Sequence, residues 1–312
     1  MILIGSFPSK SRLLLRLISM FFCKLSWVMM EIGVNLLMDE IDFDTVIETK
    51  KGWIPVNFDE LWRYRELAYI LAWRDVKIRY KQTVLGAAWA VFQPVISMVV
   101  FTVFFGNLVK VPSDGIPYPI FVYAGLLPWT FFANSMSAAS NSLIGQANLI
   151  SKVYFPRLLI PLSTFGAFIL DFFISFLIML GLMIYYGVYP TISILMVPVL
   201  LIATMATALG VGTLLSALCV AYRDVKYIVP FLVQLWMYAT PVIYPVSIVP
   251  ERWRWLLSLN PMSGLVDGFR SAFLGKPFDW QNISISLVAA VVLMCFGLAY
   301  FRKVERRFAD IV

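Results

Sequence analysis

The sequence predicts an all-α integral membrane protein with six transmembrane helices, and two observations support this prediction. Apolar residues make up 61% of the 312-residue chain and charged residues 14%, whereas soluble domains are about half apolar and about a quarter charged. Several windows also exceed the roughly eighteen uncharged residues that indicate a bilayer-spanning helix. The chain has no histidine, the commonest metal ligand, and we expect no metal site.

Residues 1–51 form an N-terminal extension whose nature the sequence leaves open. The extension is apolar in part, but Arg12, Arg16 and Lys24 interrupt it, and no small-residue cleavage site follows. A signal peptide is therefore disfavoured. An amphipathic surface helix is one interpretation. A start site assigned too far upstream, ahead of Met38, is another. We assign this extension no function.

An amphipathic interface helix is expected on the cytoplasmic side within residues 52–82. On a helical wheel Trp62, Tyr69, Trp73, Val76 and Tyr80 share one arc, and the cations Arg74, Lys77 and Lys81 occupy the next. Aromatic and cationic side chains together suit the boundary between lipid and water. A soluble helix that buries its aromatic residues in a small domain is the alternative, although little chain remains to build that domain.

Six spans are expected within residues 83–302. They cover residues 84–105, 119–147, 161–186, 192–221, 227–244 and 283–301. If the N-terminus is cytoplasmic, most cations of the short loops also lie in the cytoplasm, which is the usual bias of membrane proteins. We therefore expect a multi-pass protein of the cytoplasmic (inner) membrane. Both termini, including the tail 303–312, are expected on the cytoplasmic side.

Residues 246–280, between the last two expected spans, are predicted to form an outer re-entrant helical segment. Apolar residues keep a helical stripe there, namely Met262, Leu265, Val266, Phe269 and Phe273. Two charges within the stripe oppose a full crossing. Asn260-Pro261 and Gly275 bracket a helix of only a few turns. A loop that serves packing alone is one interpretation, and an outer gate is the other. The gate candidates are Asp267, Phe269 and Arg270.

Several motifs follow one another along the chain in a specific order. They are RDVKIRYKQTVLGAAWAVFQP from residue 74, YAGLLPWTFFANS from 123, LISKVYFPRLLIP from 149, AYRDVKYI from 221, TPVIYP from 240 and LNPM from 259. This ordered set resembles the permease subunit of type-2 ABC exporters. Within that family it is most similar to the branch that exports polysaccharide and polyol-phosphate polymers, such as O-antigen, capsule or teichoic acid. The resemblance covers residues 52–312.

The resemblance implies a homodimeric permease that moves a lipid-linked polysaccharide or polyol-phosphate polymer across the cytoplasmic membrane. Each subunit would engage a cytoplasmic ABC ATPase, so ATP and Mg²⁺ would bind the partner, and this chain would be neither an enzyme nor a cofactor carrier. The sequence agrees in one respect, because it contains no G-x-x-x-x-G-K-[ST] phosphate-binding loop. Membrane lipids and the glycan would be the other partners, and nucleic acid would not be one.

The resemblance also implies that residues 146–156 form a short cytoplasmic coupling helix that contacts the ATPase. Its polar candidates are Gln146, Asn148, Ser151, Lys152 and Tyr154. Its expected apolar anchors for the partner are Leu149, Ile150, Val153 and Phe155. Pro156 then breaks the helix. A simple turn between two spans is the alternative interpretation.

The cations of the interface helix have two interpretations. Arg74, Lys77, Arg79 and Lys81 could contact phosphates of lipid headgroups or of a lipid-pyrophosphate-linked glycan. Arg74 and Arg79 are the better phosphate ligands because a guanidinium binds with two prongs. Topology setting alone explains the same charges. In the inner loop, Arg223 and Asp224 form either a local ion pair or a contact to the interface helix or the ATPase.

Five aromatic residues are candidates for lining the glycan path, because aromatic faces stack on sugar rings. They are Trp129, Phe131 and Phe132 in the second span and Trp236 and Tyr238 in the fifth. Packing between helices or contact with lipid is the alternative. Ala206, Ala208, Gly210 and Gly212 in the fourth span are expected to form small-residue packing faces. Asp171, deep in the third span, is expected to pair across helices rather than to relay protons.

Three other function classes compete with this interpretation. An ion-coupled lipid-glycan flippase would need several intramembrane ionisable groups and usually internal repeats, and the sequence provides one acid and no clear repeat. A glycosyltransferase is suggested only by Asp42-Phe43-Asp44, which lacks a strand–helix framework. An exporter of a smaller lipid or drug in the same superfamily remains open, because a fold does not determine the cargo.

Overall fold

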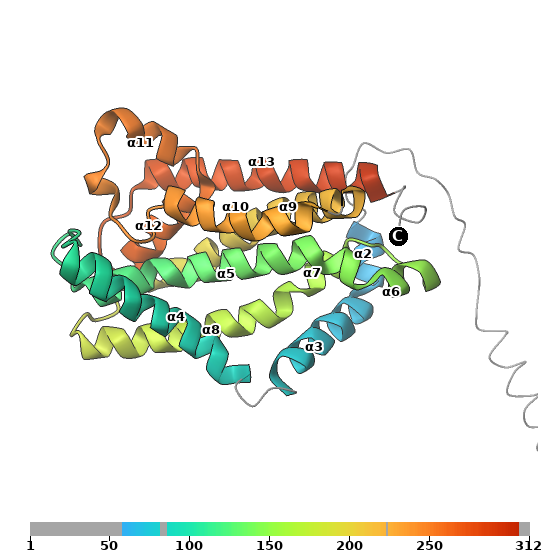
Figure 1. The fold of residues 1–312 in the computed structure, drawn as a ribbon, viewed down its shortest axis with the longest axis horizontal. Coiled ribbons are helices and arrows are strands. Elements are labelled where there is room, and N and C mark those ends of the chain that lie inside the picture. Colours follow the sequence, from blue (N-terminus) through green and yellow to red (C-terminus); the bar gives the residue numbers. More distant parts are fainter. Residues whose placement is uncertain (1–57, 82–85, 223, 306–312) are drawn as a thin grey trace, which may run out of the picture. The chain divides into compact units, whose positions relative to one another are not determined.

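The computed structural model describes residues 58–81, 86–222 and 224–305, and every regular element in these ranges is a helix (Figure 1). All described residues belong to one compact unit within Trp53–Val312. The predictions for the N-terminal extension with its Asp42-Phe43-Asp44 motif, for Arg223 and for the end of the tail lie outside the described residues.

The helices follow the expected order along the chain. They are α2 (Phe58–Arg63), α3 (Arg65–Lys81), α4 (Gly86–Phe101), the π-helical η1 (Thr102–Leu108), α5 (Tyr118–Gly145), α6 (Ala147–Lys152), α7 (Leu159–Ser163), α8 (Phe165–Tyr185), η2 (Ile192–Met196), α9 (Val197–Ala221), α10 (Val225–Ala239), η3 (Val246–Ile248), α11 (Glu251–Ser258), α12 (Pro261–Leu274) and α13 (Trp280–Glu305). We call the two ends of the bundle the α6 end and the α12 end.

Four helical segments are long and apolar enough to cross a membrane: Val91–Leu108, Leu159–Tyr185, Ile192–Ala221 and Trp280–Glu305. They coincide with the first, third, fourth and sixth expected spans. The expected second and fifth spans correspond to α5 and α10. With 28 residues α5 is about 42 Å long, enough for the hydrocarbon core of about 30 Å. α10, with 15 residues, is only about 22 Å long.

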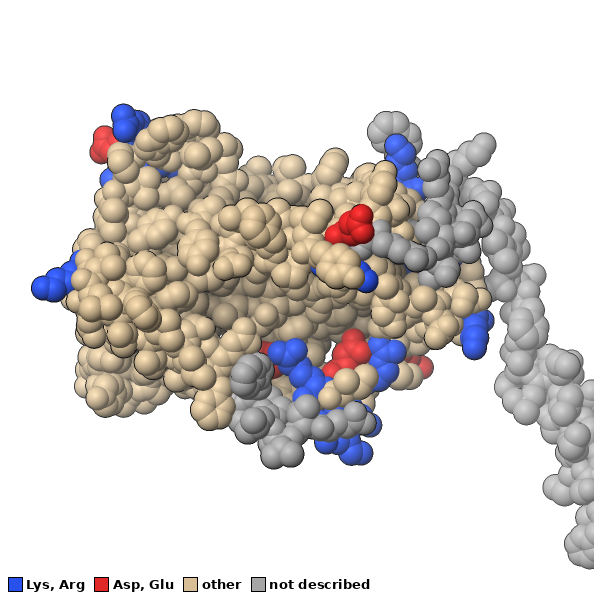
Figure 2. All heavy atoms as spheres, viewed as in Figure 1, with Lys and Arg blue, Asp and Glu red and all other residues tan. Residues whose placement is uncertain are grey.

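α5 lies at the centre of the bundle and packs against α4, α7, α8, α9, α10 and α12. Its first half is almost completely buried, with Ile120, Val122 and Tyr123 at 0% exposure. Charged side chains lie mainly toward the two ends of the bundle and around α3, and the face seen in Figure 2 is otherwise uncharged. This distribution is what a helix bundle surrounded by lipid requires.

Glycine contacts bring α9 and α13 very close together. A Cβ atom on Gly297 would lie 2.0 Å from the Gly210 carbonyl oxygen, and one on Gly210 would lie 2.6 Å from the backbone of Met294. A Cβ atom on Gly212 would come within 2.8 Å of Ala139 on α5. The predicted packing role of Gly210 and Gly212 is therefore confirmed.

The segment before α13 contains the predicted short helix. α12 begins at Pro261 after the N-cap Asn260 and ends at Gly275, whose positive φ of 68° closes the helix. The apolar stripe predicted for it is completely buried at 0% exposure, namely Met262, Leu265, Val266, Phe269 and Phe273. α12 packs against α5, α9 and α13, so neighbouring protein surrounds it.

Candidate functional site

The coupling segment, residues 146–156, projects from the α6 end of the bundle. Asn148, Ser151 and Lys152 are exposed, and the Tyr154 side chain is 75% exposed. Gln146 is half-buried and begins the segment, with its backbone carbonyl accepting from the amides of residues 149 and 150. The structure thus brings four of the five predicted polar candidates together on one accessible projection.

Two of the apolar anchors that we expected for the partner instead hold α6 to its own chain. Ile150 and Phe155 are buried at 8% and 4% exposure. They belong to a cluster whose other fully buried members are Leu143, Leu159, Ile160, Ala217, Val220 and Phe301. The expectation is therefore corrected for Ile150 and Phe155, because burial in a cluster shared with α5, α7, α9 and α13 leaves them no surface to offer. Val153, at 52% exposure, is the accessible apolar residue of the segment.

A groove of about 490 Å³ lies beside the coupling segment, between α2 and the end of α13. Glu60 and Leu61 form one wall, and Arg302 and Glu305 form another. Arg157 fixes the end of α13, because its Nη1 donates to the backbone carbonyl of Glu305 at 2.5 Å and its amide donates to Glu305 Oε1 at 3.2 Å. These hydrogen bonds therefore join the chain directly after the coupling segment to the end of α13.

Asp171 on α8 connects α3 to the third expected span. Its Oδ2 lies 2.6 Å from Nη2 of Arg79 on α3, and its Oδ1 accepts from the Tyr80 hydroxyl. The Arg79 guanidinium also stacks on Phe168, 4.7 Å from the ring centre. Burial and the hydrogen bond to Asp171 raise the pKa of Tyr80, so its hydroxyl remains a donor. The predicted cross-helix pairing of Asp171 is confirmed.

The other cations of α3 lie on its accessible surface. Lys77 and Lys81 are exposed, and they line a shallow surface depression together with Trp73 and the half-buried Arg74. Lys77 Nζ lies 5.6 Å from the Trp73 ring centre, and Arg74 pairs with the adjacent Asp75 at 2.8 Å. The two arginines that we grouped as phosphate ligands thus differ, because Arg79 is engaged by Asp171 and Arg74 faces outward.

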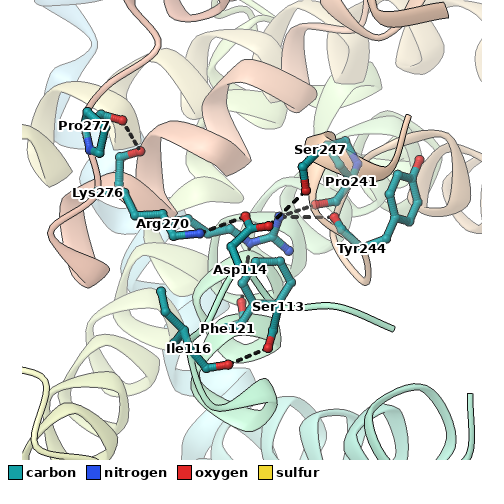
Figure 3. A network of polar contacts seen from close by, with 11 residues as sticks. Ser113, Asp114, Ile116, Phe121, Pro241, Tyr244, Ser247, Arg270, Lys276 and Pro277 are labelled. Atoms are coloured by element: carbon teal, nitrogen blue, oxygen red, sulfur yellow. Dashed lines mark hydrogen bonds and ion pairs between the residues drawn. The ribbon is translucent and has the colours of Figure 1, made fainter. Parts of the chain in front are cut away.

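Arg270 is buried at the α12 end and is held by backbone carbonyls (Figure 3). Its Nη1 and Nη2 donate to the carbonyls of Pro241 and Val242 at 2.6 and 2.5 Å, and longer bonds of 3.4 Å reach Phe121 and Tyr244. Its guanidinium lies 3.9 Å from the Phe121 ring centre. The charged guanidinium of Arg270 on α12 thus holds the TPVIYP turn and α5 together through hydrogen bonds to their backbone carbonyls.

A second polar contact joins three loops near Arg270. Asp114 accepts hydrogen bonds from Ser247 Oγ and Lys276 Nζ, each at 2.9 Å (Figure 3). Burial raises the pKa of Asp114, but the hydrogen bonds from Lys276 and Ser247 and the charge of Lys276 outweigh it, so the pKa lies below its usual value. Asp114 is therefore ionised at neutral pH and links the loop before α5 to the loops around α12.

Asn260 in LNPM joins the end of α10 to the start of α12, a role that our sequence reasoning missed. Its Oδ1 accepts from Trp236 Nε1 at 2.8 Å and from the Met262 amide at 3.0 Å. Its Nδ2 donates to Thr240 Oγ1 at 2.9 Å and to the Ala239 carbonyl at 3.3 Å. The Asn-Pro pair did indicate an N-cap. What the pattern could not reveal was that TPVIYP and LNPM contact each other.

Comparison with known proteins identifies the family of this chain. A model of the family described as ABC-2 type transporter matches residues 66–274, from the first turn of α3 to the last residue of α12. This chain belongs to the ABC-2 type transporter family. The coupling segment, Asp171, Arg270 and Asn260 all lie within the matched region.

Similar curated proteins include permeases with named export functions. The chain is 30% identical over 248 residues to the O-antigen export system permease protein RfbA of Klebsiella pneumoniae, covering 79% of this chain and 95% of the relative. It is 31% identical over 255 residues to the RfbA permease of Myxococcus xanthus, covering 80% and 97%. It is 22% identical over 242 residues to the polysialic acid transport protein KpsM of Escherichia coli, covering 74% and 91%.

Most of the aromatic path candidates in this ABC-2 family member are packing residues within the chain. Trp129, Phe131 and Phe132 are buried at 3%, 4% and 0% exposure. Phe132 packs edge-on against Trp236 at 5.0 Å, and Trp236 is hydrogen-bonded as described above. Tyr238 is 56% exposed. The structure therefore does not bring the five together on one surface, because α5 is surrounded by neighbouring helices.

The remaining candidates are separated in the same way. Phe269 is completely buried between Phe172 and Phe273, with ring centres 6.1 Å away from each. Asp267, one turn before Arg270, lines a small cavity near Asn282. Asp224 is exposed at the start of α10. Of the predicted gate residues, Arg270 alone joins several elements.

Proposed function

We propose that this chain is the membrane-embedded permease subunit of an ATP-driven exporter that moves a lipid-linked polysaccharide or polyol-phosphate polymer across the cytoplasmic membrane. Family membership and the export functions named for the RfbA and KpsM relatives support this proposal. The proposal includes a homodimer, six spans per subunit with α5 and α10 as the second and fifth, and cytoplasmic termini. ATP and Mg²⁺ bind the partner ATPase.

The main support for the proposal is the combination of exposed polar residues and buried apolar residues in the coupling segment. Its exposed polar tips suit a cleft on a partner protein, whereas its buried anchors Ile150 and Phe155 share one buried cluster with residues of α5, α9 and α13. A displacement of the tips by the ATPase therefore moves three long helices together, because packed interiors transmit strain. An ordinary loop between two spans would not need this anchoring.

The exposed surface of α3 supports contact with phosphate at the cytoplasmic face. Trp73, Arg74, Lys77 and Lys81 line one depression on α3. An aromatic ring beside positive charges suits headgroup phosphates or the pyrophosphate of a lipid-linked glycan. Arg79 has a different task, since its bond to Asp171 holds α3 against α8. In this proposal the interface helix both receives the charged end of the substrate and stays attached to the bundle.

Removing the exposed tips of the coupling segment tests the proposal. We expect the double variant Lys152→Ala and Tyr154→Ala to lose most of the ATPase that co-purifies with the wild-type permease, and to lose polymer export in cells. Tyr189→Ala is the matched control, because Tyr189 is 80% exposed but lies in the loop after α8.

Normal ATPase recovery and normal polymer at the cell surface in the double variant would contradict the proposal. Extraction of lipids from the purified complex distinguishes the cargo. A lipid-linked glycan supports the proposed substrate class, whereas a smaller lipid or drug alone would refute it.

A further inference from the structure

One face of α5 carries an uncharged polar track, which consists of Thr130, Asn134, Ser137 and Asn141. Their spacing of four, three and four residues places them on the same side of the helix. Thr130, Asn134 and Ser137 are half-buried and Asn141 is exposed, while Ala138 is the other residue between them that is not buried. The track is about 16 Å long at 1.5 Å per residue.

The side chains of the polar track have little to bind within the described part of the chain. Asn134 and the Ser137 hydroxyl make no hydrogen bond there. Asn141 Nδ2 donates to the Ser137 carbonyl at 2.9 Å and to Ser140 Oγ at 3.3 Å, both within its own helix. Thr130 donates only to the Leu127 carbonyl of its own helix, at 3.1 Å. A bilayer-spanning helix with unused amide and hydroxyl groups on an accessible face indicates a polar occupant, because lipid offers these groups no partner.

A small cavity of about 20 Å³ beside the track is lined by polar and apolar side chains together. Its polar residues are Gln93, exposed on α4, and Thr130 and Asn134 of the track. Ser175 and the ion pair of Asp171 with Arg79 lie on its other side. Gln93 also makes no hydrogen bond to the described residues. Amide side chains both donate and accept, so they can exchange partners without a change of protonation.

Faces of this protein that suit lipid look different. On α13 the exposed residues include Val288, Val291 and Val292, at 64%, 52% and 59% exposure. The polar run 134–142 of α5 contains two asparagines and four serines and no charge. An apolar face such as that of α13 needs no partner other than lipid. The polar track, in contrast, needs a partner that forms hydrogen bonds.

We propose that the polar track of α5, together with Gln93 of α4, contacts the sugar chain during export. This inference rests on the proposed function and assigns the contact surface for its substrate. A hydroxyl-rich polymer offers donors and acceptors at short intervals, and neutral amides and hydroxyls exchange such bonds as the chain advances. The absence of charge from the track prevents it from holding an anionic group at one point. The surface therefore replaces the buried aromatic residues as the substrate contact.

Cysteine labelling in native membranes tests this assignment. In a background with Cys23→Ala, Cys219→Ala and Cys295→Ala, we would introduce Asn134→Cys or Ser137→Cys in cells that co-express the ATPase. Both thiols should react with a charged, membrane-impermeant maleimide, and polymer production should slow the reaction at least several-fold. The matched control is Val288→Cys, which should react slowly whether or not polymer is made, because a thiolate does not form readily in lipid.

Two results would overturn the assignment. One is labelling of Asn134→Cys and Ser137→Cys no faster than that of Val288→Cys. The other is a disulfide between two copies of Ser137→Cys that forms equally well with and without polymer, which would place the track in a contact between copies. Protection by polymer without such a disulfide supports the assignment.

A functional variant separates this inference from the proposed function. We expect Asn134→Leu to lower surface polymer at least several-fold at an unchanged membrane level of the protein, and Asn134→Gln to retain export. If the wild-type chain fails to restore polymer to cells that lack it, the proposed function fails. If the wild type restores polymer and Asn134→Leu does so equally, only the assignment of the track fails.

Discussion

Replacing Arg270 with methionine should destabilise the α12 end of the permease strongly. Methionine has a similar length but no donor, so the carbonyls of Pro241 and Val242 lose their shortest hydrogen bonds. Hydrogen bonds to a charged group contribute about 1.5–3 kcal/mol each, and a desolvated cation–π contact like that with Phe121 adds about 2 kcal/mol. Part of this is offset because a buried cation no longer has to be desolvated.

Two charged hydrogen bonds and the cation–π contact, less this offset, leave a net loss in the free energy of unfolding of about 3–5 kcal/mol. For a chain of this size each kcal/mol lowers the midpoint of thermal unfolding, Tm, by about 2 °C. We therefore expect Tm of the purified Arg270→Met permease, followed by tryptophan fluorescence, to fall by about 6–10 °C. Gly125→Ala should also lower Tm, since its Cβ atom would lie 2.8 Å from Arg270 Nη2.

Arg254→Met is the matched control for this measurement. Arg254 lies on α11, its side chain is 45% exposed, and its pair with Glu251 is 3.8 Å long. Exposed pairs of this kind contribute about 1 kcal/mol or less. If Arg270→Met lowered Tm no more than Arg254→Met does, the assignment of a structural role to the buried arginine would be wrong.

Three further predictions concern other parts of the bundle. Asp171→Asn removes the charge that pairs with Arg79 on α3. Because the Arg79 guanidinium is then left unpaired, both Tm and export should fall. Normal export in cells would contradict this role. Because the pKa of Asp114 is depressed in the folded protein, its stabilising contribution is present above its unfolded pKa and is lost as pH falls through the folded value. Tm of the wild type should thus fall more than that of Asp114→Asn between about pH 6 and about pH 3, and parallel Tm profiles would refute this. Gly297→Val should abolish accumulation of folded protein, as judged by size-exclusion chromatography, because no side chain fits against Gly210. Gly181→Val is the control, since nothing lies within 4 Å of its Cβ position.

The sequence predicted the positions of the long helices well because a bilayer-spanning helix requires a long uncharged segment. The window assigned to the second span, 119–147, differs from α5 by one residue at its start and two at its end. The short helix α12 was bracketed correctly because proline and glycine act locally on the backbone. Hydropathy could not show that α10 has only 15 helical residues, since the apolar run continues into the TPVIYP turn.

The roles of individual side chains were harder to predict because they depend on which helices are neighbours. A helical wheel shows that Phe131 and Thr130 point in different directions, but not that α8 covers one and leaves the other accessible. Arg270 illustrates the same limit, since its partners are backbone carbonyls and carry no sequence signature. Asp171 was assigned correctly because an acid within a span needs a partner wherever that partner lies.

The position of α5 explains how the two ends of the permease can act together. At the α6 end, Leu143 on its last turn belongs to the cluster that anchors the coupling segment. At the α12 end, Gly125 on its second turn leaves the space that Arg270 occupies. A helix is stiff along its axis, so a displacement of α6 reaches the Arg270 contacts through a single element rather than through loops. The same helix presents the polar track between these two points. In the proposed mechanism, an ATPase that moves the coupling segment would therefore shift the polar track and the opposite end of the bundle in one motion, without a separate relay between them.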